Sequence, residues 1–97
     1  MDQNVIPGCS IAPEDREPQA VRIATVARSV ARVEREPRLL RFHLEPGVDR
    51  RALEEMVATE RECCPFYRFD TTDHTLTVAV EDDEHVPALD AFAQLLS

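Results

Sequence analysis

The sequence predicts an α+β fold, a two-layer sandwich in which a short, mainly antiparallel sheet carries helices on one face. Residues 40–44 alternate apolar and polar side chains, which is typical of a half-buried strand. Residues 50–63 are strong helix formers without glycine or proline. The chain has 97 residues, 43% of them hydrophobic, and this is material for one core. We therefore expect a single α+β domain over residues 19–97, preceded by an irregular arm over residues 1–18.

The first elements are predicted from prolines and β-branched residues. Pro7, Pro13 and Pro18 favour irregular structure, so regular structure is expected only after the last of them. Apolar residues recur at helical spacing from Gln19 on, and β-branched residues that continue to Val33 favour a strand after the helix. We expect one helix and then one strand over residues 19–33.

The next strand and helix have clear ends. Pro37 separates the first strand from the alternating one, which the turn Glu45-Pro46-Gly47 closes. Asp49 is a suitable N-cap because its carboxylate can accept hydrogen bonds from the first amides of a helix. We expect that helix to span residues 50–63 and to end before Pro65.

The C-terminal third predicts a hairpin and a last helix. Residues 66–71 and 75–80 form the hairpin around Thr72-Asp73-His74. The acidic run at residues 81–84 precedes the last helix, where the positive end of the helix dipole attracts anions. The apolar stripe of this helix consists of Val86, Leu89, Phe92 or Ala93, and Leu96.

Composition excludes several classes of protein. Eleven arginines against 19 acidic residues give a net charge of −8, so direct binding to nucleic acid is not expected. The sequence has no apolar run of membrane-spanning length and no basic-then-apolar leader, and its three cysteines are an odd number. We therefore expect a cytoplasmic protein with free thiols. The net charge is +4 over residues 16–41 and −9 over residues 42–97, and this asymmetry could support a homodimer.

The candidate site lies at the end of the predicted central helix. A stripe at steps of three and four residues begins apolar and ends with a carboxylate and two thiols: Leu53, Met56, Val57, Glu60, Cys63 and Cys64. Each polar member has a simple structural explanation. Glu60 could reach solvent or pair with an arginine such as Arg41, and the cysteines could be small core residues. Their combination at one helix end indicates a functional cluster instead.

Thiol chemistry is the function that this cluster favours. Adjacent cysteines bridge each other only through a strained ring, whereas either could pair with Cys9. Two neighbouring thiolates with Cys9 as a third suit a thiophilic ion such as mercury or arsenic. Zinc is the second choice, and a fourth ligand would then come from His43, His74 or His85.

Catalysis by a cysteine is the alternative from another class. Cys63 or Cys64 would be the nucleophile, and Glu60 would be the acid or base. A helix C-terminus disfavours a free thiolate, which a nucleophile needs, whereas a bound cation would itself stabilise the thiolate. The position therefore favours a ligand role over a nucleophile. A third hypothesis is a sensory module in which Phe66 and Phe69 close an apolar pocket for a small molecule.

The stretch Glu60-Arg61-Glu62-Cys63-Cys64-Pro65-Phe66-Tyr67-Arg68-Phe69 resembles the E-x-x-C-C-x-F-x-x-F signature of small bacterial proteins. Such proteins occur alone or appended to mercury-responsive (MerR-like) regulators. The resemblance spans about residues 9–96, maps Glu60 and the cysteine pair directly, maps Phe66 and Phe69 as the aromatic positions, and maps Cys9 loosely. It implies a fold and a thiol site, together with a link to thiophilic metals and metal resistance.

Overall fold

The computed structural model describes residues 12–96 and confirms the α+β class. The elements follow one another along the chain as α1 (Pro13–Ala27), β1 (Val30–Glu36), β2 (Leu39–Leu44), α2 (Arg50–Cys63), β3 (Arg68–Thr71), β4 (Thr75–Ala79), a short 3-10 turn η1 (Asp83–His85) and α3 (Val86–Leu95). The described chain is thus a helix with a hairpin, a second helix with a hairpin, and a last helix.

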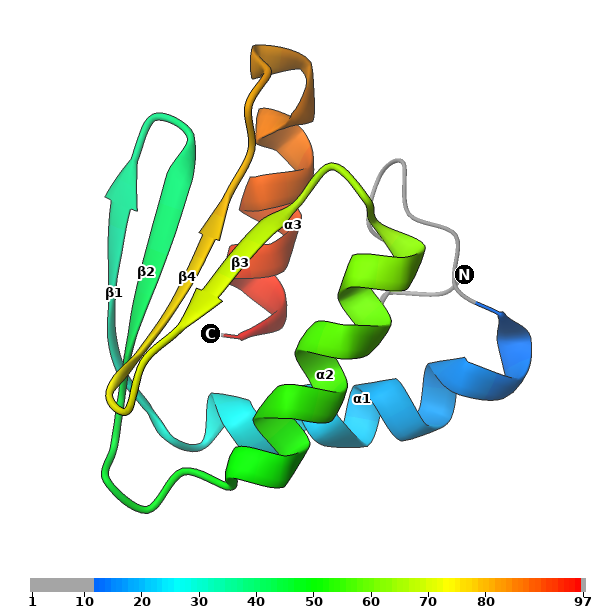
Figure 1. Cartoon of the computed structure of the whole chain (residues 1–97), viewed down its shortest axis with the longest axis vertical. Helices are drawn as coiled ribbons and strands as arrows, with labels where there is room; N and C mark the ends of the chain where they lie inside the picture. Colours follow the sequence, from blue (N-terminus) through cyan, green and yellow to red (C-terminus); the bar gives the residue numbers. More distant parts are fainter. Residues whose placement is uncertain (1–11, 97) are drawn as a thin grey trace.

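The four strands form one antiparallel sheet in the order β1-β2-β4-β3. Each hairpin pairs strands that are neighbours in sequence, and β2 with β4 joins the two hairpins. In Figure 1, α3 lies behind the strands, α2 lies beside β3 and packs against α1, and β1 forms the opposite edge. The end of α2 therefore lies at the β3 side of the molecule.

One face of the sheet carries the core. Leu40, Phe42 and Leu44 of β2 and Leu76 and Val78 of β4 are buried, whereas the alternate residues of both strands are only half-buried. The helices add the remaining core side chains, among them Ile23, Val26, Leu53, Met56, Leu89 and Phe92. Helices on one face and a solvent-facing second side form the predicted two-layer arrangement.

The predicted limit of the N-terminal arm is wrong, because α1 begins at Pro13 rather than after Pro18. Pro13 stands at the first helical turn, where a missing N–H costs nothing. Pro18 lies inside the helix and cannot donate to the carbonyl of Glu14, which is an exposed residue. The strand predicted up to Val33 continues to Glu36, and residues 1–11 of the predicted arm, Cys9 included, lie outside the described residues.

The central helix and its cap are confirmed. The Asp49 carboxylate accepts a hydrogen bond from the amide of Ala52 at 3.0 Å, and α2 spans Arg50–Cys63 as predicted. The hairpin of β3 and β4 and the last helix are also confirmed, with Leu89, Phe92 and Leu96 buried along the predicted stripe. Both strands are shorter than predicted, because β3 begins at Arg68 rather than at residue 66 and β4 ends at Ala79. These elements fix the position of the candidate site at the C-terminal end of α2.

Candidate functional site at the end of α2

The last turn of α2 separates the two thiols. Glu60 is only 4% exposed and Cys64 is fully buried, whereas Cys63 is half-buried. Consecutive residues of a helix point about 100° apart. The predicted stripe therefore holds for Glu60 and Cys64, which are four residues apart, but Cys63 lies beside it.

Cys64 and Cys63 differ in bonding as well as in burial. Cys64 is disulfide-bonded, and Cys63 carries a free thiol, so the two neighbours are not joined to each other. Oε2 of Glu60 lies 3.5 Å from the sulfur of Cys64. The structure thus brings the predicted carboxylate and one predicted thiol into contact inside the core. The third predicted ligand, Cys9, lies outside the described residues.

Gln19 of α1 joins this cluster and was not predicted. It is 2% exposed, and its Nε2 donates to the carbonyl of Met56 at 3.0 Å, which holds α1 against α2. It also hydrogen-bonds Glu60. Gln19 stands four residues before Ile23 and so falls on the apolar spacing of α1. A polar residue at such a core position is the sequence signal that could have predicted its role. The proposed pairing of Glu60 with Arg41 is wrong, because Arg41 lies 3.6 Å from Glu36 on the solvent-facing side of the sheet.

Burial dominates the electrostatics of the cluster. It raises the pKa of Glu60, and the hydrogen bond with Gln19 opposes this shift only in part. Burial also raises the pKa of the Cys63 thiol, and the nearby charges of Glu60, Glu62 and Asp15 raise it further. The raised pKa disfavours the thiolate form of Cys63 and makes this thiol a poor nucleophile, as its position at a helix C-terminus predicts.

Cys63 is one of the residues that line a surface hollow of about 340 Å³. The N-terminal part of α1 and the C-terminal part of α2 form its walls, with Ala12, Asp15, Arg22, Thr59, Glu62 and Cys63. Arg22 is fixed there because its guanidinium donates to Thr59 Oγ1 at 3.4 Å and to Gln19 Oε1 at 3.2 Å. Cys63 thus lines a polar surface hollow, whereas Cys64 is fully buried and does not line it.

The aromatic residues of the motif, Phe66 and Phe69, are half-buried and pack against the core. Phe66 stacks on His85 with ring centroids 4.5 Å apart, and Phe69 packs against Tyr67 and Phe92 at 5.5 and 5.9 Å. The hydroxyl of Tyr67 donates to the carbonyl of Ala88 at 2.6 Å, and burial raises its pKa. Phe66 and Phe69 line neither the hollow at Cys63 nor a second one of about 670 Å³ near the start of α1.

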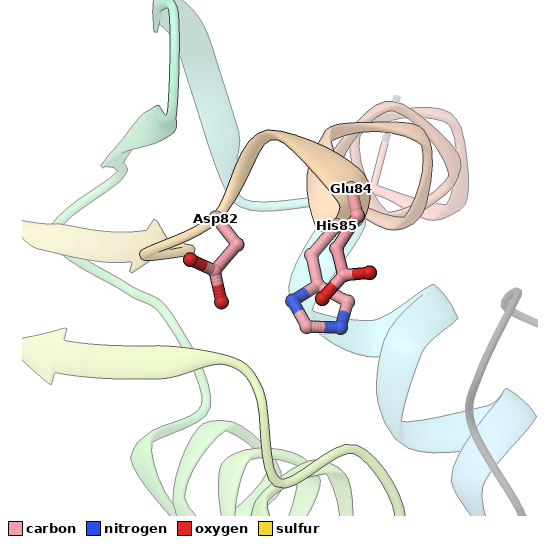
Figure 2. A group of neighbouring side chains, drawn as sticks. All are labelled: Asp82, Glu84 and His85. Carbon is pink, nitrogen blue, oxygen red and sulfur yellow. The ribbon is translucent and has the colours of Figure 1, made fainter.

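The histidines lie apart from the thiols. His43 pairs with Glu34 on the solvent-facing side of the sheet, and His74 is exposed in the hairpin turn. His85 groups with Asp82 and Glu84, one ligand atom from each lying within 4.8 Å of the others (Figure 2). Both acids are exposed, and the cluster contains no cysteine. Among residues 12–96, no histidine groups with a cysteine in a set of side chains that could hold a metal ion.

Comparison with family models, with curated proteins and with solved structures finds no match to this chain. Within residues 12–96, none of the helices has the length and apolar character needed to cross a membrane.

Proposed function

We propose that the end of α2 is a thiol–disulfide redox site in which Cys64 alternates between a disulfide and a thiol. One observation carries this proposal: a fully buried, disulfide-bonded Cys64 lies in contact with the carboxyl group of Glu60, while its neighbour Cys63 stays a free thiol. The chain has one cysteine besides these two, so we propose Cys9 as the residue bonded to Cys64.

The burial of Cys64 sets the order of the exchange reaction. A thiolate of an external dithiol attacks the sulfur bonded to Cys64, because Cys64 itself is inaccessible. The S–S bond breaks, its electron pair leaves on Cys64, and the attacked sulfur stays joined to the reductant in a mixed disulfide. The second thiolate of the reductant then attacks the reductant's own sulfur in this bond, which closes the reductant's disulfide and releases the attacked protein sulfur as a thiolate that takes a proton from solvent. In total, one external dithiol is oxidised and one protein disulfide is reduced to two thiols.

In this reaction Glu60 donates a proton to the Cys64 thiolate on reduction and accepts the proton of the Cys64 thiol on oxidation. The leaving Cys64 thiolate forms in a buried place at a helix C-terminus, where negative charge is disfavoured. A protonated Glu60 at contact distance neutralises the thiolate, and in the oxidation direction the carboxylate accepts the proton of the Cys64 thiol.

Equilibration with mixtures of reduced and oxidised dithiothreitol tests the site, with alkylation of free thiols read by mass spectrometry. We expect one reversible two-electron transition in the wild type and in Cys63→Ser, and none in Cys64→Ser. Glu60→Gln should slow reduction at neutral pH, whereas the matched control Glu54→Gln, an exposed carboxylate on the same helix, should not. A wild-type disulfide that does not form again after reduction would refute the proposal.

A second candidate function is capture of a thiophilic metal or metalloid, mercury or arsenic before zinc, by the reduced chain. The observation in its favour is the surface hollow lined by Cys63, a thiol whose sequence neighbour is a second thiol after reduction. Titration of the reduced protein with mercury(II), arsenite or zinc, followed by thiolate charge-transfer absorbance, tests this function. The signal should disappear in Cys63→Ser combined with Cys64→Ser, and the oxidised protein should bind less. Equal signals in the reduced wild type and the double variant would exclude it.

A further inference from the structure

β1 leaves one edge of the sheet open. No other described strand pairs with its outer side, and Figure 1 shows no helix beside it. Val33 in the middle of this strand is 40% exposed, which makes it one of two large apolar residues exposed in the described part of the chain. An open edge with an apolar centre can accept a further strand.

Hydrogen bonds of β2 show which backbone groups of β1 point outward. The amide of Leu44 donates to His74, and the carbonyl of Arg38 accepts from the amide of Val80, so even-numbered residues of this stretch bond towards β4. Because bonding directions alternate along an antiparallel strand, the odd-numbered residues Leu39, Arg41 and His43 bond towards β1.

The partners of those three residues in β1 are Glu36, Glu34 and Arg32. Their backbone groups are therefore used inside the sheet. The N–H and C=O groups of Val33 and Arg35 point to the open edge instead. The register of β1 with β2 shifts between Val30 and Arg32, so the strand is regular only from Arg32 on. A partner strand must therefore place an outward-directed residue of its own opposite Val33.

We propose that a second copy of this chain binds here, β1 against β1 in antiparallel orientation, so that the two sheets become continuous. Pairing centred on Val33 sets Val33 opposite Val33 and places Arg32 opposite Glu34 of the other copy, twice by symmetry. Both charged residues lie on the solvent-facing side of the sheet, since they pair with His43 and Arg41 of β2. The dimer thus covers the exposed valine and forms two cross-strand ion pairs.

Charge complementarity selects this register over its neighbours. A displacement in one direction sets Arg32 against Arg32. A displacement in the other direction pairs Arg32 with Glu36, but it also sets Glu34 against Glu34 and Val33 against Arg35. Of these three registers, only the one centred on Val33 sets opposite charges against each other and contains no like-charged pair. The alternating charges of β1 therefore permit one pairing of two copies and disfavour slipped ones.

Charge reversal with mixing tests the register by analytical ultracentrifugation. Wild type should dimerise in a concentration-dependent manner, and Arg32→Glu alone or Glu34→Arg alone should weaken the dimer about tenfold or more, because each creates two like-charged pairs. An equimolar mixture of the two variants should restore association, since the carboxylates of one variant then face the guanidinium groups of the other at both pairs. Asp70→Arg on β3, at the opposite edge, should leave the dimer unchanged.

Circular dichroism of each variant shows that the monomer is still folded. A wild type that stays monomeric up to about 1 mM would overturn the proposal. So would a mixture that associates no better than each variant alone. Neither result bears on the redox site, because β1 contributes no residue to it.

Discussion

Two carboxylates of this protein stand in opposite environments, Glu60 at the end of α2 and Glu34 on β1. Glu60 is buried, and burial raises its pKa although Gln19 hydrogen-bonds it. Glu34 is exposed, and a hydrogen bond with His43, with smaller contributions from nearby positive charges, lowers its pKa. Both have a polar partner, so solvent access decides the direction of the shift. At the end of α2, we therefore expect a change of one buried side chain to alter the stability of the fold and the reactivity of Cys64. At the β1 edge, we expect a change of one charged side chain to alter the proposed pairing with a second copy instead.

The largest expected effect comes from Phe92 of α3, in the core next to the aromatic residues that follow α2. Phe92 is fully buried and packs against Tyr67 and Phe69. Phe92→Ala should lower the free energy of unfolding by about 3–5 kcal/mol, because it leaves a cavity in the core. Urea denaturation measures this loss. Val33→Ala at the β1 edge is the comparison and should cost far less at concentrations at which the chain is monomeric; equal losses would contradict the contrast between the two regions.

A smaller loss is expected from the buried hydroxyl beside the site. Tyr67→Phe removes the hydrogen bond to the Ala88 carbonyl and leaves that carbonyl without this donor. The free energy of unfolding should fall by about 1–2 kcal/mol. Thermal denaturation followed by circular dichroism measures it, and an unchanged midpoint would mean that water replaces the hydroxyl.

The pH dependence of stability separates the two carboxylates. The pKa of Glu60 is raised above its ordinary value of 4.5 in the folded chain, so its contribution to stability is fully present below pH 4.5 and is lost as pH rises through the raised pKa. Glu60→Gln, which keeps a neutral side chain, should therefore have a higher melting temperature than wild type at pH 7.5 and a similar one at pH 4. Glu54→Gln, at an exposed position of the same helix, is the matched control and should raise the melting temperature at pH 7.5 far less.

The smallest effect is expected at Glu34. Its lowered pKa means that any contribution is present above pH 4.5 and is lost as pH falls through the lowered value, the reverse of Glu60. The group is exposed, so screening by solvent keeps the contribution small. Glu34→Gln should leave the melting temperature at pH 7.5 nearly unchanged. A loss as large as that of Tyr67→Phe would show that the surface pair with His43 stabilises the fold.

Most elements of the fold could be predicted because their signals are local. The alternation in β2, the Asp49 cap and the proline after α2 each act within a few residues, and the structure confirms them. The start of α1 could not be predicted in this way, since proline is tolerated in a first helical turn as well as in an arm.

The candidate site was predictable only in part. Helical spacing placed Glu60 and Cys64 on one buried face, but it also assigned Cys63 to that face, which the structure corrects. The contribution of Gln19 depends on how α1 packs against α2, and this contact joins residues 37 positions apart in sequence. Whether Cys9 joins the cysteine pair stays a prediction.

The strand order β1-β2-β4-β3 has a consequence for folding. Each hairpin can close early because its strands are neighbours in sequence, whereas β2 and β4 meet only when the two halves of the chain come together. This central pairing is therefore the slow, non-local step. Amide hydrogens between β2 and β4 should exchange with solvent last, and the outward amides of Val33 and Arg35 should exchange among the first at concentrations at which the chain is monomeric.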